Sequence, residues 1–256
     1  DLHRRRHSFP TRRSSDLKEA FIKNSDPQYK DQMFNKGSGI DVYIDGCRFL
    51  PDNATVTKII VRFLNSELTD VVSFQGGRPE LDSDIYNPIF NFRQELRAPN
   101  FDPTLMMYIT FITFDERGRI KQPSILGYSM FNLFINRKTK QQPLDRGEFE
   151  DTILQDGCYQ IPIYCQPFVK ENPFYVKTCE KYDKLPASSV LIRIHKSPIS
   201  EDGLKNLSIN TPGFEDKKKK EEYGIWRLPP KYSTGAYNSA MCGARQSEIE
   251  LAELRK

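Results

Sequence analysis

Histidine and the motifs of catalysis are scarce in this chain of 256 residues. His195 is the only histidine after residue 17, and it ends a predicted strand. The chain has no Gly-x-Ser-x-Gly, no phosphate-binding Gly-x-x-x-x-Gly-Lys loop and no His-Glu-x-x-His. The Gly76-Gly77 pair lacks the lysine and the helix that a phosphate loop requires. We therefore predict that the chain is not an enzyme and has no small-molecule substrate.

Long apolar runs and paired cysteines are also missing. No stretch approaches the roughly 18 apolar residues that a membrane-spanning helix needs, and no segment has the pattern of a secretory signal. Five cysteines at wide gaps, without a Cys-x-x-Cys pair, argue against a disulfide framework and a zinc site. They favour reduced thiols in the cytoplasm. Cys47 and Cys158 lie in predicted strands, where we expect small core residues.

Residues 1–17 hold most of the positive charge in excess. The whole chain has 38 basic and 34 acidic residues, and this segment has five arginines and two aspartates, which leaves 33 against 32 and a net charge of +1. The segment resembles a translated sequencing adapter, and a basic nucleic-acid arm or a targeting peptide is the alternative. Composition therefore gives no case for a nucleic-acid partner.

The two ends of the chain lack the strand pattern of its middle. Ser247, followed three residues later by Glu250, is typical of the start of a capped helix, and we expect the chain to be a fragment of a longer protein. After residue 200 the strand pattern is lost, and charge runs and prolines follow. The predicted organisation is an artefact leader at 1–17, a linker at 18–38, a β-sandwich at 39–197, a disordered tail at 198–246 and the start of a truncated helix at 247–256.

The middle of the chain shows the pattern of short strands. Ile40, Val42 and Ile44 alternate with polar or aromatic residues, which predicts a half-buried strand. The run 105–114 is nearly all apolar or β-branched, which predicts a central strand buried on both faces. The first predicted strand begins at 40 and ends in the turn at 49–53, and the others are 55–64, 71–74, 85–96, 105–114, 124–135, 157–164 and 190–195.

These strands, with no strong helix between them, predict an all-β fold: an eight-stranded antiparallel sandwich with disordered or extended flanks. An immunoglobulin-type sandwich is the nearest alternative. Its Cys–Trp–Cys signature is absent, because the only tryptophan, Trp226, lies in the tail.

The order of the strands and of two short motifs resembles a C2 domain. Asn87–Phe92 is similar to the Asn-Pro-x-Phe-Asn signature of that family, and Ile125-Leu126-Gly127 is similar to the start of the following strand. Strand 40–45 would run into Leu-Pro at the first loop, and 190–195 would be the last strand of the permuted topology. The resemblance covers 39–197. It implies a C2-type β-sandwich that docks on membranes or proteins through loops at one end.

The resemblance also raises the question of calcium. Calcium-binding members supply about five aspartates from the first and third loops. Here the first loop offers Asp52 and the third offers Asp115 and Glu116, with Ser124 in place of the closing aspartate. Since calcium takes roughly six to eight oxygen ligands, we expect solvated loop residues and no cofactor. Weak calcium binding is the alternative.

We predict a calcium-independent docking domain of a cytosolic scaffold or adaptor that binds protein partners. Its exposed strand faces and the tail around Trp226 and Tyr232 are the first surfaces to consider, because aromatic residues are favoured as interface anchors. C2 domains joined to coiled coils occur in cilium- and centrosome-associated families, which suggests such a location. The alternative is a peripheral module on anionic membranes, where each basic residue near the surface contributes about 1 kcal/mol. Its candidate contacts are Phe49, Leu50 and Asp52 at the first loop, Asp115 and Glu116 at the third, Lys58 and Arg62 on one strand face, and the loop residues Arg137, Lys138 and Lys140.

Overall fold

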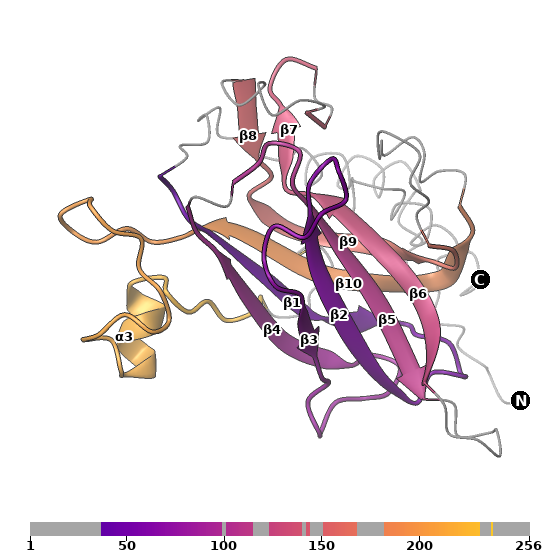
Figure 1. Ribbon diagram of the computed structural model, residues 1–256. Helices are drawn as coiled ribbons and strands as arrows, with labels where there is room; N and C mark the ends of the chain where they lie inside the picture. Colours follow the sequence, from indigo (N-terminus) through magenta and orange to yellow (C-terminus); the bar gives the residue numbers. More distant parts are fainter. Residues whose placement is uncertain are drawn as a thin grey trace, which may run out of the picture.

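In this computed structural model the fold is all-β, and a single eight-stranded antiparallel sheet forms a nearly closed barrel (Figure 1). The structure describes residues 37–98, 101–114, 123–139, 142–143, 151–167, 182–230 and 237. The strands of the sheet are β1 (Ile40–Arg48), β2 (Val56–Leu64), β3 (Gln75–Gly77), β4 (Ile89–Leu96), β5 (Met106–Phe114), β6 (Pro123–Asn132), β9 (Gly157–Tyr164) and β10 (Lys184–Lys196). A two-stranded sheet pairs β7 (Phe134–Asn136) with β8 (Thr152–Leu154), and one short helix is α3 (Lys217–Glu222).

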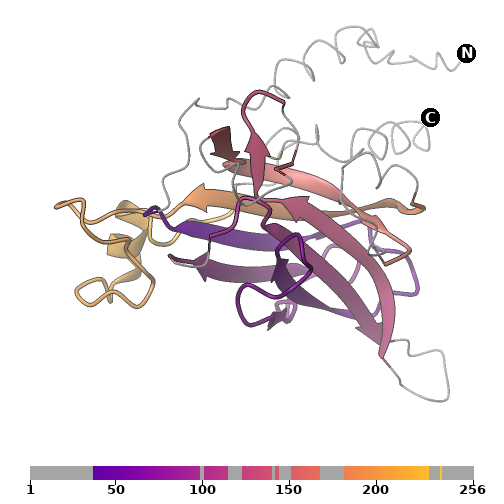
Figure 2. The ribbon, with the colours of Figure 1, turned by 45° about the horizontal axis from the view of Figure 1, so that its top comes forward.

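The sheet consists of two four-stranded halves. Its order is β3-β2-β5-β6-β9-β10-β1-β4, and β6 meets β9 through one residue pair, Tyr128 and Tyr164. At this narrow junction the halves fold over each other (Figure 2). The core between them takes residues from both halves, such as Ile59 and Phe111 from the first and Val42 and Ile192 from the second. The prediction of an all-β fold with an eight-stranded antiparallel sheet is confirmed.

Alternation along β2 and β5 decides which side chains enter this core. Ile59 and Val61 of β2 point inward, whereas their neighbours Lys58 and Ile60 are half-buried on the outer face. β5 follows the same rule, with Phe111 in the core and Ile112 on the outer face. The prediction that 105–114 is buried on both faces was therefore wrong. The apolar residues of its outer face look away from the core.

β1 is more deeply buried than predicted. Asp41, Tyr43 and Asp45 alternate with the core residues, yet they are only 0%, 3% and 1% exposed. The strand is buried on both faces, so the prediction of a half-buried strand was wrong. The reason is a cover that comes from far along the chain, residues 198–230, here called the C-terminal segment.

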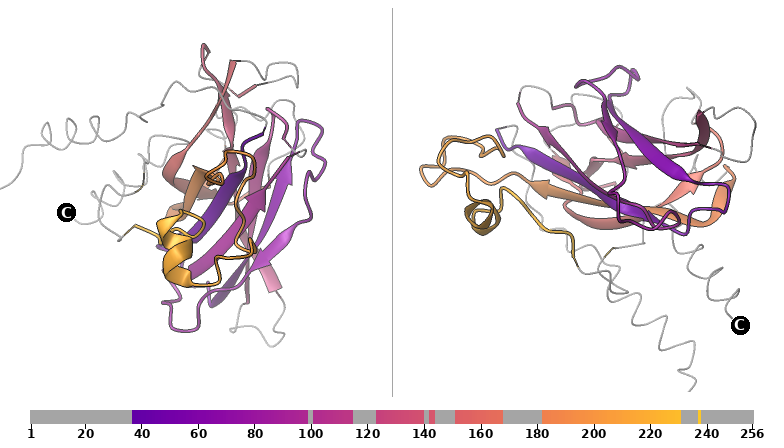
Figure 3. Two further views of the ribbon diagram at one scale, coloured as in Figure 1. Left: turned by 90° about the vertical axis from the view of Figure 1, so that its left-hand side faces the viewer. Right: turned by 90° about the horizontal axis from the view of Figure 1, so that it is seen from below.

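The C-terminal segment runs beside β1 and β10 (Figure 3). It carries α3, whose first turn is capped by the Asp216 carboxylate accepting from the Lys218 amide. Ile225 is fully buried, and the Leu207 carbonyl accepts a hydrogen bond of 3.0 Å from the Arg97 guanidinium. Residues 198–230 thus differ from the disordered tail predicted from 198 onward, because their backbone carbonyls accept hydrogen bonds from Arg97 and Arg193. The regions predicted at 1–17 and 247–256 lie outside the described residues.

Two further strands differ from the prediction. The third strand was placed at 71–74, but β3 is Gln75–Gly77. A Cβ on Gly77 would lie 2.7 Å from Cγ1 of Ile59, so this pairing depends on close backbone approach, which apolar periodicity does not reveal. β8 lies in a stretch that we predicted as a loop, where it pairs with β7.

Candidate docking surface

The outer face of β2, β5 and β6 carries a row of apolar side chains. Antiparallel pairing places Lys58 opposite Ile112, and Ile112 opposite Ile125. Val56 and Ile125 are 48% and 57% exposed, and Ile60, Ile112 and Phe114 on the same face are half-buried. Such contiguous exposure on a sheet is typical of a contact surface. We call five of these residues the apolar patch: Val56, Ile60, Ile112, Phe114 and Ile125.

Beyond Ile60, a second and smaller hydrophobic cluster covers the same face. Met106 and Met130 are buried there together with Tyr164, and Leu68 packs on them from the turn after β2. This cover ends before Ile112, so the apolar patch occupies only the end of the face where β2 begins.

The two basic residues predicted on this face do share it, but their charges are engaged. Arg62 donates two hydrogen bonds to Asp70, at 2.9 Å and 2.7 Å, and the hydrogen bond with Asp70 raises the pKa of Arg62. The ammonium group of Lys58 lies 5.0 Å from the centre of the Phe114 ring, within the range of a cation–π contact. Among the described residues of the outer face, Lys58 is therefore the cation without a carboxylate partner.

The basic loop predicted around residue 138 belongs to the separate β7–β8 sheet. Lys138 donates to the Asp151 carboxylate at 2.7 Å, across the hairpin. Arg137 is half-buried beside it, and its amide donates to the Asp151 carbonyl. Lys140 lies outside the described residues. The described part of this loop is held by pairing within the hairpin.

The first loop differs from the predicted contact tip. Leu50, predicted as a membrane or partner contact, is only 3% exposed and packs in the main core, so it has little surface to offer to either. Its amide donates to the Tyr86 carbonyl, and the Phe49 amide donates to Oδ1 of Asn87. These bonds hold the loop against the chain that leads into β4. Phe49 itself remains partly exposed, and Asp52 is exposed.

The third loop begins at the same end of the sheet as the first. The Thr55 amide donates to Oγ1 of Thr113 at 3.0 Å, and the Thr55 hydroxyl donates to the Phe114 carbonyl. Asp115 and Glu116 follow directly, but they lie outside the described residues. Within the described part of the chain, no group of three or more His, Cys, Asp or Glu side chains is arranged to hold a metal ion.

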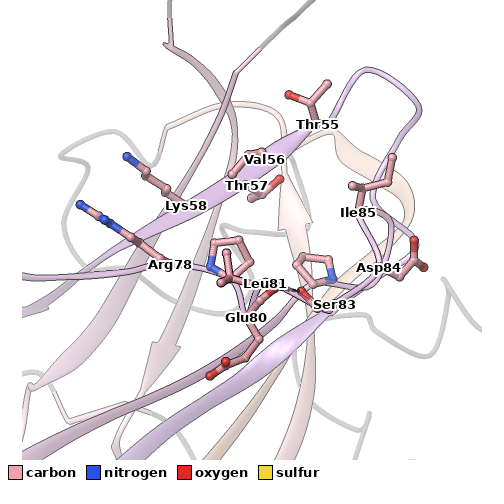
Figure 4. A pocket seen from close by; sticks show the side chains of 12 residues that line it. Thr55, Val56, Thr57, Lys58, Arg78, Glu80, Leu81, Ser83, Asp84 and Ile85 are labelled. Atoms are coloured by element: carbon pink, nitrogen blue, oxygen red, sulfur yellow. Dashed lines mark hydrogen bonds between the residues drawn. The ribbon is translucent and has the colours of Figure 1, made fainter.

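A pocket of about 260 Å³ lies beside the apolar patch, between the start of β2 and the loop 78–88 (Figure 4). Val56 belongs to both surfaces, and Lys58, from the same face of β2, also lines the pocket. From the loop come Leu81, which is fully exposed, and Ile85. We call this the edge pocket. Sequence reasoning missed its loop residues, although isolated apolar residues in a polar, proline-containing loop are a signal of surface contact.

The opposite outer face, on β4, β1 and β10, is polar and covered. Arg93 and Ser197 both reach the Asp41 carboxylate, at 3.3 Å and 2.9 Å. The Tyr43 ring has the Arg193 guanidinium 4.3 Å from its centre and that of Arg93 at 5.7 Å. These side chains are buried under the C-terminal segment, so we assign them to the attachment of that segment.

The histidine and two of the cysteines in the described part of the chain lie in structural surroundings. His195 Nδ1 lies 3.0 Å from the Asp156 carboxylate, and its ring meets the edge of Tyr43. Burial raises the pKa of the Cys47 thiol and brings that of Cys158 to about 11, so both thiols stay protonated at neutral pH and are poor nucleophiles.

Comparison of the chain with protein-family models and with curated proteins gave no significant match. Among the described residues, no helix has the length and apolar character needed to cross a membrane. The case for a function therefore depends on the residues and geometry of the chain itself.

Proposed function

We propose that this chain is a calcium-independent, C2-like docking domain that binds a protein partner through the apolar patch. The observation that carries the proposal is the exposed apolar row on the outer face of β2, β5 and β6, at the end where Val56 and Ile125 lie. Contiguous exposed apolar side chains lose contact with water when a partner covers them, and this drives association.

The C2-like part of the proposal is supported by the strand arrangement. Two four-stranded antiparallel halves face each other across one core, and the loops after β1 and β5 leave the same end. The Asn-Pro motif enters β4, where the Pro88 carbonyl accepts from the Cys47 amide at 2.9 Å.

A protein partner is favoured over an anionic membrane by the charges at this end. A membrane contact without calcium needs several basic residues that face the surface together. Arg62 is paired with Asp70, and the adjoining loop exposes Glu80, Asp82 and Asp84, which an anionic surface would repel. A partner with a complementary apolar surface avoids this repulsion, because its charges can be placed to suit.

Capture by the full chain tests the proposal. The double variant Ile112→Glu/Ile125→Glu places two charges in the apolar patch, and Ile199→Glu/Leu204→Glu makes the same change at exposed apolar residues of the C-terminal segment. Proteins recovered with the wild type should also be recovered with Ile199→Glu/Leu204→Glu. With Ile112→Glu/Ile125→Glu the amount recovered should fall at least about tenfold, which corresponds to roughly 1.4 kcal/mol of binding free energy. The interaction is then reconstituted with the purified partner and measured by calorimetry.

Sedimentation with phosphatidylserine vesicles tests the membrane alternative. Binding in chelator that weakens with added salt would support the membrane alternative and contradict protein docking through the patch. Binding only with calcium would contradict calcium independence and assign ligands to the third loop. The scaffold role and the association with cilia remain predictions, which localisation of the tagged chain in ciliated cells would test.

A further inference from the structure

The edge pocket exists because β3 is short. β3 pairs with Ile59, Ile60 and Val61 only, so the first part of β2 has the loop 78–88 beside it instead of a strand. The loop is held in place from behind, where the Glu80 amide donates to the Ile89 carbonyl at 2.7 Å. A hollow therefore remains at the sheet edge, directly beside the apolar patch.

Part of the lining of the edge pocket is apolar. Val56, Leu81 and Ile85 contribute aliphatic surface. Thr57 also lines the pocket, but it is 1% exposed and its Oγ1 is closed to solvent. A bound group would therefore meet the aliphatic surface in this part of the pocket.

Two cations line the pocket. In Figure 4 the side chains of Lys58, from β2, and Arg78, from the loop 78–88, extend in the same direction. Among the described residues neither forms an ion pair. Like charges placed together attract an anion.

The acidic residues of the pocket do not neutralise this pair. Glu80 accepts from Nδ2 of Asn91 at 2.9 Å. Asp84 accepts from Nδ2 of Asn87 at 2.6 Å and from the Tyr86 amide. Glu80 is thus bound to β4 and Asp84 within the loop 78–88, and in Figure 4 both carboxylates point away from Lys58 and Arg78. The pocket consequently offers an apolar hollow with a cationic side that is open to a ligand.

We propose that the edge pocket takes an apolar side chain from a segment of the protein partner, and that an aspartate or glutamate next to it in that segment pairs with Lys58 and Arg78. This inference rests on the proposed docking function and specifies the chemistry of the partner. The volume of about 260 Å³ is below the roughly 300–1,000 Å³ typical of sites for small organic ligands. It suits one anchoring side chain, and the charge pair selects an acidic neighbour.

Titration of the isotope-labelled full chain with three synthetic peptides tests this inference by NMR. The first peptide is Ser-Leu-Phe-Asp-Asp-Ser, the second has lysines for its aspartates, and the third has serines for Leu-Phe. We expect only the first to shift the amide signals of Thr57, Lys58 and Leu81. The variant Lys58→Glu/Arg78→Glu should weaken this peptide at least about tenfold and bind the lysine peptide instead. The matched variant Lys205→Glu/Lys217→Glu changes charge equally, at exposed residues of the C-terminal segment, and should bind like the wild type.

Three results would overturn the inference: no shift at these residues with the first peptide, equal shifts with all three peptides, or unchanged binding by the Lys58→Glu/Arg78→Glu variant. The capture experiment keeps the two proposals separate. If Ile112→Glu/Ile125→Glu loses the partner while the peptide titration fails, docking through the apolar patch stands and the edge pocket is excluded as its anchor. If neither experiment shows an effect, both proposals fail.

Discussion

Arg193 forms a bidentate pair with Asp45: its Nε donates to Oδ2 at 2.7 Å, and its Nη2 donates to Oδ1 at 2.8 Å. The two side chains are only 4% and 2% exposed. The Tyr237 hydroxyl adds a hydrogen bond of 2.6 Å to the same carboxylate, and the carbonyls of Arg227 and Leu228 accept from the guanidinium. A pair from β1 and β10 thereby fastens the C-terminal segment to the sheet.

Removal of one charge from this pair should be costly. Asp45→Asn leaves a buried guanidinium uncompensated, for which we expect a loss of about 3–5 kcal/mol in the free energy of unfolding. Urea unfolding of the full chain measures it. The matched control is Asp70→Asn, which breaks the exposed pair with Arg62 and should cost less than about 1 kcal/mol. Similar losses in the two variants would show that the Asp45–Arg193 pair has no special role.

A chain that ends at residue 200 should be less stable than one that ends at 245. Its Arg97 and Arg193 would lose the carbonyl partners that Leu207, Arg227 and Leu228 provide. A hydrogen bond to a charged group contributes about 1.5–3 kcal/mol. Thermal unfolding of 37–200 and 37–245 compares the two, and equal midpoints would mean that the C-terminal segment does not stabilise the sheet.

The contact between Asp156 and His195 predicts a pH dependence. Burial raises the pKa of Asp156, but the hydrogen bond with His195 and the charges of His195 and Arg227 outweigh it, so the pKa falls below its usual 3.8. A carboxylate whose folded pKa is lowered stabilises the fold above the unfolded pKa, and this contribution is lost as pH falls through the folded value.

Asp156→Asn should therefore be less stable than the wild type above pH 3.8, and the two should converge as pH drops below it. Urea unfolding in steps from neutral to acidic pH measures the difference. His195→Gln, which removes the partner, should reduce the same pH-dependent difference. A constant gap between Asp156→Asn and the wild type over the whole range would contradict the assignment.

Sequence periodicity predicted the inward faces of the strands, because alternation depends on the chain alone. Burial of the outer faces depends on segments distant in sequence, and there the prediction failed. Asp41 and Tyr43 look like solvent-facing residues in the sequence, but the C-terminal segment covers them. Ile112 looks like a core residue, but it lies on the outer face.

The candidate surface was predictable only in part. That Lys58 and Arg62 share a face follows from their spacing of four in a strand. The pairing of Arg62 with Asp70 depends on the turn after β2. Arg78 lines the same pocket as Lys58 because of how the loop 78–88 folds back. Periodicity describes neither turn, so the cations of the edge pocket could not be brought together from the sequence.

Gly127, in the Ile-Leu-Gly motif that the sequence singled out, lies at the narrow junction of the two halves. A Cβ there would stand 2.6 Å from Cγ2 of Ile163 and 2.7 Å from the Tyr164 carbonyl oxygen. The second contact is with backbone, which has little freedom to move, and it adjoins the single pair that joins β6 to β9. Gly127→Ala should therefore overpack the junction and cost about 1–3 kcal/mol.

Gly76→Ala is the matched control, because the nearest atom to its Cβ would be the Ile59 carbonyl oxygen at an ordinary 3.7 Å. This variant should change the free energy of unfolding by less than about 1 kcal/mol in either direction. Urea unfolding compares the two substitutions in the full chain. A Gly127→Ala protein as stable as Gly76→Ala would mean that β6 and β9 separate without cost, and that the junction does not hold the two halves of the sheet together.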